Sequence, residues 1–179
     1  MTTDTLQSAM TAIRSAWGPL TTELVETCRQ TLETLLQAPT AEPWLASLHR
    51  DAPASRELYR DQDQGFVLMA HTEQAGLYRP PHDHGRGWVI YAIQQGEIEM
   101  GTYARSLEPD GGVRLVKRDA TLVRAGQARV YLPGDIHDTL CISGPALLLR
   151  FTERDLKVED QRDHRVTRYV DRRGVWTAP

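Results

Sequence analysis

The chain is poor in cysteine, in net charge and in long apolar runs, and each shortage removes a class of protein. Its two cysteines, Cys28 and Cys141, lie far apart and outside any CxxC pair, which favours two reduced thiols over a disulfide. A net charge of −3 gives no electrostatic reason to expect nucleic acid or an anionic membrane as a partner. No apolar run approaches the roughly 18 residues of a membrane span.

The remaining composition is that of an ordinary globular protein. Hydrophobic residues make up 40% of the 179 residues and charged residues 25%, so nothing indicates disorder. This length predicts one domain with a sizeable core. The first residues carry an early acid in a helical pattern, unlike a signal peptide. We therefore expect a cytoplasmic protein.

The N-terminal part has a helical period. From Thr5 to about His49, apolar residues recur every three or four positions, which predicts two or three helices. Gly18-Pro19 should end the first helix, Thr21 or Thr22 should begin the second, and Thr40 is expected to cap the third. These helices are expected to pack on the rest of the domain; a regulatory or dimerising element is the alternative.

After Pro53 the pattern changes to short strands separated by glycine and proline turns, which indicates a sandwich or barrel. Within the single domain, residues 1–52 are the helical part, 57–152 the barrel and 153–179 a C-terminal extension that can add an edge strand over 165–170. The expected strands cover residues 66–71, 87–94, 98–103, 113–116, 121–123, 129–132, 138–142 and 146–151.

Three of the six histidines stand in positions that fit one metal site. Residues i and i+2 of a strand face the same side, so His82 and His84 can present two imidazoles to one ion. His137 follows a Pro-Gly turn and is the first inward side chain expected on a new strand. Asp83 alternates to the opposite face and is expected to orient the turn rather than to bind metal. The remaining histidines are expected to be structural or exposed: His49, His71 and His164.

These residues also resemble a known family. Gly76, the His82-x-His84 pair and Gly96, followed by Pro133-Gly134 and then His137, resemble the paired motifs of the cupin superfamily. The resemblance covers roughly residues 58–152. It implies a mainly β fold: a double-stranded β-helix, or jelly-roll-like barrel, with a small N-terminal helical pack.

The chain departs from the usual cupin pattern at the metal site. The usual glutamate, four or five residues after the second histidine, is replaced by Trp88 or Val89, and the usual asparagine after the last histidine by Cys141. A three-histidine site without the carboxylate is similar to the cysteine dioxygenase-like, or thiol dioxygenase, branch. That likeness implies non-haem Fe(II), a small carboxylated thiol and O₂ as reactants, and a sulfinic acid as product. A second matching segment around Leu58–His71 implies that Arg60 binds the substrate carboxylate.

The ligand set is consistent with this chemistry without choosing the metal. Three neutral imidazoles leave a divalent ion at a charge of +2, which favours an incoming thiolate. Imidazole suits iron, zinc, copper and nickel alike. Fe(II) is thus implied by the resemblance, with nickel, zinc or manganese as alternatives.

The chain also departs from this branch at residues that assist its chemistry. Animal-type cysteine dioxygenases carry a Ser-x-His-x-Tyr run that aligns with Leu148, Arg150 and Thr152, so the helper tyrosine is missing. The cysteine that some members crosslink to it aligns with Val89. Hydroxyl groups from neighbouring strands are candidate replacements: Tyr91, Tyr103 or Tyr131.

Arg150 interrupts an apolar strand, and it must either face solvent or cross the barrel. Its alternating partners 147, 149 and 151 look more like core, which argues that Arg150 faces out. It remains a candidate for the substrate pocket, together with Tyr91 and Cys141. Cys141 lies on the same strand face as His137, and a small buried lining residue is the expected role.

Three functions remain open at this point. The first is a thiol dioxygenase-like enzyme, the second a metal-containing cupin that binds a small ligand without turnover, and the third a cupin dioxygenase or isomerase with another substrate. The partners expected are a small-molecule thiol and O₂, without nucleic acid or membrane, and possible pairing into a homodimer through an exposed sheet face.

Overall fold

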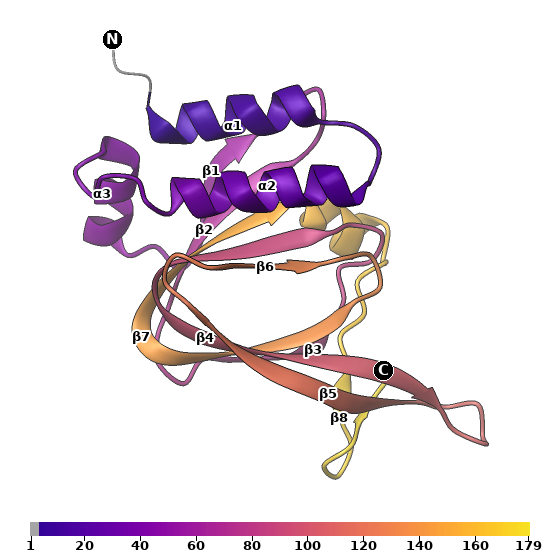
Figure 1. Cartoon of the computed structure of the whole chain (residues 1–179). Helices are drawn as coiled ribbons and strands as arrows, with labels where there is room; N and C mark the ends of the chain where they lie inside the picture. Colours follow the sequence, from indigo (N-terminus) through magenta and orange to yellow (C-terminus); the bar gives the residue numbers. More distant parts are fainter. Residues whose placement is uncertain (1–3) are drawn as a thin grey trace.

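The computed structural model describes residues 4–179 and contains three α-helices, a curled antiparallel sheet and a short π-helix, η1 (Val158–Arg162). The fold class expected from the sequence is confirmed as a mainly β barrel of curled antiparallel strands with a small N-terminal helical pack. In Figure 1 two helices lie above the barrel, the third lies at its side, and the chain ends against the long β hairpin.

The helices are α1 (Thr5–Ala16), α2 (Thr22–Leu35) and α3 (Pro43–Asp51). Thr21 caps α2, since its hydroxyl accepts a hydrogen bond from the Leu24 amide at 3.1 Å. The expectation that Thr40 caps α3 is wrong. Glu42 is the capping residue, because Pro43 has the fixed φ that suits the first helical position.

Within residues 4–179, nine strands form one sheet, in which every pairing is antiparallel. The strands are β1 (Arg56–Arg60), β2 (Val67–Glu73), β3 (Tyr78–His82), β4 (Val89–Leu107), β5 (Val113–Arg124), β6 (Ala128–Tyr131), β7 (Ile136–Thr152), β8 (Val170–Asp171) and β9 (Trp176–Thr177). The central strands β4 and β7 pair with each other along most of their length. The first half of β4 pairs with β6 and the second half with β5, while β7 pairs with β3 and then β2.

The expectation of many short strands is wrong for the two longest ones. Residues 87–94 and 98–103 largely belong to one strand, β4, and residues 138–142 and 146–151 to another, β7. The chain bends at register shifts between Ile93 and Ile98 instead of ending there. Gly96 lies in this bend at φ +86°, where a Cβ would come within 2.8 Å of Ala146 Cβ. The bend lets one strand serve two parts of the curled sheet.

The expected strands leave out β3, although the interpretation of the metal site placed His82 and His84 on one strand; His84 lies just beyond the end of β3. Pro80 and Pro81 lie where the β3–β7 register shifts, between Arg79 and His82, so neither proline has to donate a regular ladder bond. The strand then ends at His82, paired with His137 of β7. Two of the candidate ligands are thus cross-strand neighbours.

Both faces of the sheet are buried, one against the helices and one inside the barrel. The outer core joins helix residues such as Leu45 to barrel residues such as Phe66 and Phe151. The inner core contains alternate residues of the same strands, among them Val89, Tyr91 and Leu148. Alternation along β4 and β7 therefore separates two buried faces rather than core from solvent.

The C-terminal extension lies along the site end of the barrel and is tied to it by several bonds. The backbone amide of Tyr169 donates to the carbonyl of Pro81 at 3.0 Å. The buried carboxylate of Glu159 accepts from Arg86 at 2.8 Å and from Arg154 at 3.3 Å. The edge strand expected over 165–170 is mostly irregular, with a single bridge from Arg168 to His82 and β8 starting only at Val170. No helix within residues 4–179 is long and apolar enough to cross a membrane.

Candidate metal centre

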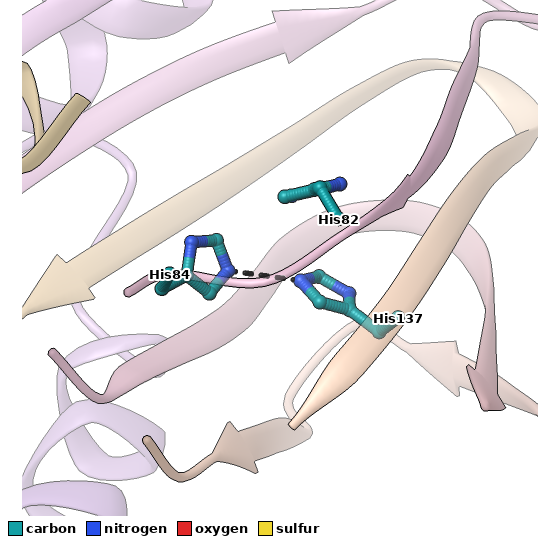
Figure 2. Close-up of side chains that lie close together, drawn as sticks. All are labelled: His82, His84 and His137. Carbon is teal, nitrogen blue, oxygen red and sulfur yellow. Dashed lines mark hydrogen bonds between the residues drawn. The ribbon is translucent and has the colours of Figure 1, made fainter. Parts of the chain in front are cut away.

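His82, His84 and His137 lie together at the end of β3 and the start of β7 (Figure 2). One ring nitrogen from each lies within 4.8 Å of the others. The closest pair is His84 Nε2 and His137 Nε2, 2.9 Å apart. The i, i+2 spacing and the distant third histidine thus bring together the residues that the sequence singled out.

Hydrogen bonds help to decide which ring nitrogens are free. His82 Nδ1 lies 2.8 Å from the carbonyl oxygen of Pro80. Because a carbonyl only accepts, Nδ1 carries the proton and the Nε2 lone pair is free to bind a cation. For His137, Nδ1 is buried and has no hydrogen-bond partner in the described chain.

The site fits a divalent ion bound through imidazole nitrogens. Two nitrogens each about 2.1 Å from one ion, at a right angle to each other, would lie roughly 3.0 Å apart. The 2.9 Å between His84 Nε2 and His137 Nε2 is close to that value. Without a cation, these two buried lone pairs face each other unless one nitrogen carries a proton.

The electrostatic environment keeps the three imidazoles neutral. Burial lowers the pKa of His82, and it lowers the pKa of both His84 and His137 well below the usual value. Neutral imidazole is the metal-binding form, so near neutral pH these side chains need not lose a proton first.

Asp83 holds the turn between the two adjacent histidines. Its Oδ1 accepts from the Thr167 amide at 2.9 Å and the Gly85 amide at 3.1 Å, and its Oδ2 from Arg105 at 2.9 Å. It does not belong to the histidine cluster. The expectation that it orients the turn agrees with this placement.

A cavity of about 500 Å³ opens beside the histidines, lined by inward-facing residues of β2, β3, β4 and β7 and by the C-terminal extension. This volume suits a small ligand. His82 and His84 are part of its wall. Any molecule that reaches the histidines through the cavity must also meet the charged side chains that line it.

Arg60 lines the same cavity, but its guanidinium is already bound by carboxylates of the protein. It lies 2.7 Å from Glu57 and 2.7 Å from Asp155. Its acidic neighbours in sequence, Asp61 and Asp63, are not among these partners. These two pairs leave little of the Arg60 fork for a ligand.

Arg150 also lines the cavity, so the argument that it faces out is wrong. Leu149 and Phe151 do lie in a core, but it is the one beneath the helices, outside the barrel. Arg150 and Leu148 therefore point to the inside. Arg150 Nε is buried and has no hydrogen-bond partner within residues 4–179.

The other candidates for the pocket have different surroundings. Tyr91 lines the cavity, and its hydroxyl lies 3.5 Å from His84 Nε2. The Tyr131 ring stacks on His137 at 3.9 Å between centroids, while the Tyr103 hydroxyl binds Asp138 at 2.5 Å. Cys141 belongs to the inner core and not to the cavity wall, and its thiol contacts the carbonyl of Glu73. Of these three tyrosines, Tyr91 is the one whose hydroxyl contacts a nitrogen of a histidine ligand.

Sequence reasoning missed two polar residues of the cavity, His71 and Glu73 on β2. Glu73 is 2% exposed and pairs with Arg79 at 2.8 Å, yet its Oε2 has no partner in the described chain. The available signal was the alternation along β2, which puts Val67, His71 and Glu73 on one face. A strand that turns polar residues toward a barrel interior indicates a ligand cavity.

His71 predicts how stability depends on pH. Burial, with a smaller contribution from Arg150, lowers its pKa to about 4, against about 6.5 in an unfolded chain. Between these values the folded protein binds fewer protons than the unfolded one, so its free energy of unfolding falls as the pH drops. From pH 7 to pH 5 this residue alone should remove about 2 kcal/mol.

Urea denaturation of the wild type and of His71→Gln at both pH values measures this contribution. Between pH 7 and pH 5 the variant should lose about 2 kcal/mol less stability than the wild type does. The pH dependence of stability that remains in the variant comes from the other buried histidines. Equal losses in the two proteins would contradict the assignment.

Comparisons with known proteins support no particular activity. No protein-family model matches the chain, and no curated protein does either. Among solved structures, similar folds occur in KdgF from Halomonas sp., with 17% identity, a TM-score of 0.41 and coverage of 55% of this chain and 74% of that one. The cupin domain of Schizosaccharomyces pombe Cnp3 has 16% identity, a TM-score of 0.44 and coverage of 62% and 69%. A cupin superfamily protein from Desulfitobacterium hafniense has 15% identity, a TM-score of 0.42 and coverage of 56% and 76%.

The chain forms a barrel of curled antiparallel strands, with three histidines at one end that could hold a metal ion.

Proposed function

We propose that the protein is a metal-dependent cupin enzyme that oxidises a small carboxylated thiol with O₂ to a sulfinic acid. The observation that carries the proposal is the ligand set: within the described chain, the cluster consists of three neutral histidines and includes no carboxylate. Fe(II) is the proposed ion, and the resemblance to cysteine dioxygenase-like proteins at His82, His84 and His137 motivates both the metal and the substrate class.

The charge of the site favours an anionic reactant. A divalent ion held by three neutral imidazoles keeps its full charge of +2, whereas a carboxylate ligand would reduce it to +1. When bound, such an ion would hold a thiolate and O₂ side by side and polarise the O₂. The thiol sulfur gains both oxygen atoms and O₂ is the only oxidant, so no separate reductant is required.

Side chains of the protein would prepare the reactants. His82, His84 and His137 bind the ion, and the Pro80 carbonyl and Asp83 hold the first two in place. Burial raises the pKa of the Tyr91 hydroxyl, which keeps its proton near neutral pH. With that hydroxyl 3.5 Å from His84 Nε2, Tyr91 can donate a hydrogen bond to a reactant beside the ion, a role open because Thr152 occupies the helper tyrosine's position.

The test is oxygen consumption by protein loaded anaerobically with Fe(II). We expect uptake on adding at least one of cysteine, 3-mercaptopropionate and cysteamine, with one O₂ used per thiol and the sulfinic acid detected by mass spectrometry. The same protein loaded with Zn(II) should bind the thiol without consuming O₂. If no thiol in the panel increases uptake over the rate without thiol, the proposed reaction is wrong.

A second candidate is a metal-containing cupin that binds a small ligand without turnover. Thr152 at the helper position favours it, because threonine has no phenol to take part in the chemistry. Tight binding of a small acid by the Fe(II) protein, with neither uptake nor product over hours, would distinguish this candidate from the enzyme.

A further inference from the structure

The cavity wall contains four arginines, and three of them are already neutralised. Arg60 pairs with Glu57 and Asp155. The other two pairs are Arg79 with Glu73 at 2.8 Å and Arg168 with Asp160 at 2.6 Å. Arg150 is the exception, since no carboxylate of residues 4–179 lies within 4.0 Å of its guanidinium.

The surroundings of Arg150 make this exception costly for the protein alone. Its Nε is buried without a hydrogen-bond partner, and a buried donor left unsatisfied destabilises the protein, more so when the group is charged. Several cavity residues are apolar and offer it no partner, including Met69, Leu148 and Leu156. An anion bound in the cavity would offset this cost.

Arg150 is also held in a fixed position. It lies near the C-terminal end of β7, where the strand is flanked on both sides, with Met69 of β2 as its partner on one side and Tyr91 of β4 on the other. A side chain on the central strand of a sheet is more rigidly placed than one on a loop. Arg60, in contrast, lies at the end of the edge strand β1.

Contacts connect Arg150 to the histidine cluster through one neighbour. Tyr91 is its cross-strand partner, and the Tyr91 hydroxyl lies 3.5 Å from His84 Nε2. All three residues face the same cavity. A small molecule beside the histidines can therefore extend along Tyr91 toward the guanidinium.

We propose that Arg150 determines substrate specificity by binding the carboxylate of the substrate, in the role that the resemblance implies for Arg60. A guanidinium fork matches a planar carboxylate through two parallel hydrogen bonds. This inference rests on the proposed function for the identity of the thiol, but the carboxylate site itself does not require turnover.

His71 adds a second point of contact. Its Nδ1 lies 3.2 Å from the carbonyl of Ala54, so Nδ1 carries the proton and Nε2 is an acceptor. That Nε2 is buried, has no partner in the part of the chain described, and belongs to a residue of the cavity wall. A substrate with a hydrogen-bond donor near its carboxylate would satisfy both groups.

Calorimetric titration of the Zn(II)-loaded protein tests the inference without catalysis. The probes are 3-mercaptopropionate, propionate as the carboxylate without the thiol, and cysteamine as the thiol without the carboxylate. In Arg150→Gln, 3-mercaptopropionate and propionate should bind on the order of 10- to 100-fold more weakly, while cysteamine should bind as well or better. Arg150→Lys should retain part of the affinity, because it keeps the charge and loses the fork.

Arg60→Gln is the matched control, and it should change the affinity for either acid by less than about threefold, because Glu57 and Asp155 already occupy its fork. Thermal unfolding adds a readout that a structural role would not give: Arg150→Gln should melt at the same temperature or higher, since it removes a charged group that has no carboxylate partner and whose Nε is buried without a hydrogen bond. A fall in melting temperature with equal losses for all three probes would overturn the proposal. So would an effect confined to Arg60→Gln, or no binding of either acid by the wild type.

The outcomes separate this inference from the proposed reaction. If both acids bind through Arg150 but no thiol supports oxygen uptake, the specificity site stands and the thiol dioxygenase proposal fails. If oxygen uptake occurs and the KM for 3-mercaptopropionate is unchanged in Arg150→Gln, the proposed reaction stands and the role of Arg150 is wrong.

Discussion

Replacing His137 with alanine should remove most of the metal from protein purified without chelator. His137 is fully buried, it contributes the Nε2 that lies 2.9 Å from His84 Nε2, and its ring stacks on Tyr131. Loss of an outer partner of a metal ligand typically costs 10- to 100-fold in affinity, so loss of a ligand itself should cost more than about 100-fold. Elemental analysis of the two proteins side by side measures the difference.

His49→Ala is the control, because His49 is exposed on α3 and lies outside the histidine cluster. Its metal content should equal that of the wild type. His84→Ala should behave like His137→Ala. If either ligand variant kept the full metal content, the ion would be bound elsewhere, and the charge argument for a thiolate would lose its basis.

The second large effect is expected in the core beneath the helices. Phe66 is fully buried, and its ring centroid lies 4.7 Å from Trp17, 5.4 Å from Phe151 and 5.7 Å from Tyr59. Phe66→Ala should lower the free energy of unfolding by about 3–5 kcal/mol, through lost burial and the cavity left behind. That is a large part of the 5–15 kcal/mol typical of a whole domain.

Guanidinium denaturation followed by circular dichroism measures this change. Leu107→Ala is the matched control, because Leu107 is 76% exposed at the end of β4 and should change stability by less than about 0.5 kcal/mol. A loss below about 1 kcal/mol in Phe66→Ala would mean that the helices contribute little to the stability of the barrel.

The histidine cluster could be predicted because its signal is local and repeated. The i, i+2 pair at His82 and His84 needs only the period of an extended chain, and the Pro-Gly turn before His137 marks where a further strand begins. The fold adds what no single segment encodes. His82 of β3 pairs with His137 of β7, which lies 55 residues later in the chain.

The direction of Arg150 could not be predicted from alternation alone. Alternation assumes that the more apolar face of a strand is the inner one, and β7 violates this because the helices cover its outer face. The residues beneath the helices are accordingly Leu147, Leu149 and Phe151, while Leu148 and Arg150 line the interior. Only the three-dimensional position of the helices decides between the two faces.

Strand length was misjudged for a related reason. Gly96 and Gly144-Pro145 are residues that normally mark turns, yet β4 and β7 continue through them. A barrel of this kind needs strands that bend sharply and then pair with a second set of neighbours. Single-sequence turn signals do not distinguish a bend inside a strand from its end.

The bonds between Asp83 and Thr167 have a consequence for the order of events during synthesis. The amide of Thr167 donates to the Asp83 carboxylate, and the Asp83 amide donates to the Thr167 carbonyl. As the chain leaves the ribosome, the loop carrying His84 emerges more than eighty residues before the segment that fastens it. Metal uptake in a growing cell should therefore wait until the segment around Thr167 has emerged and bonded to this loop.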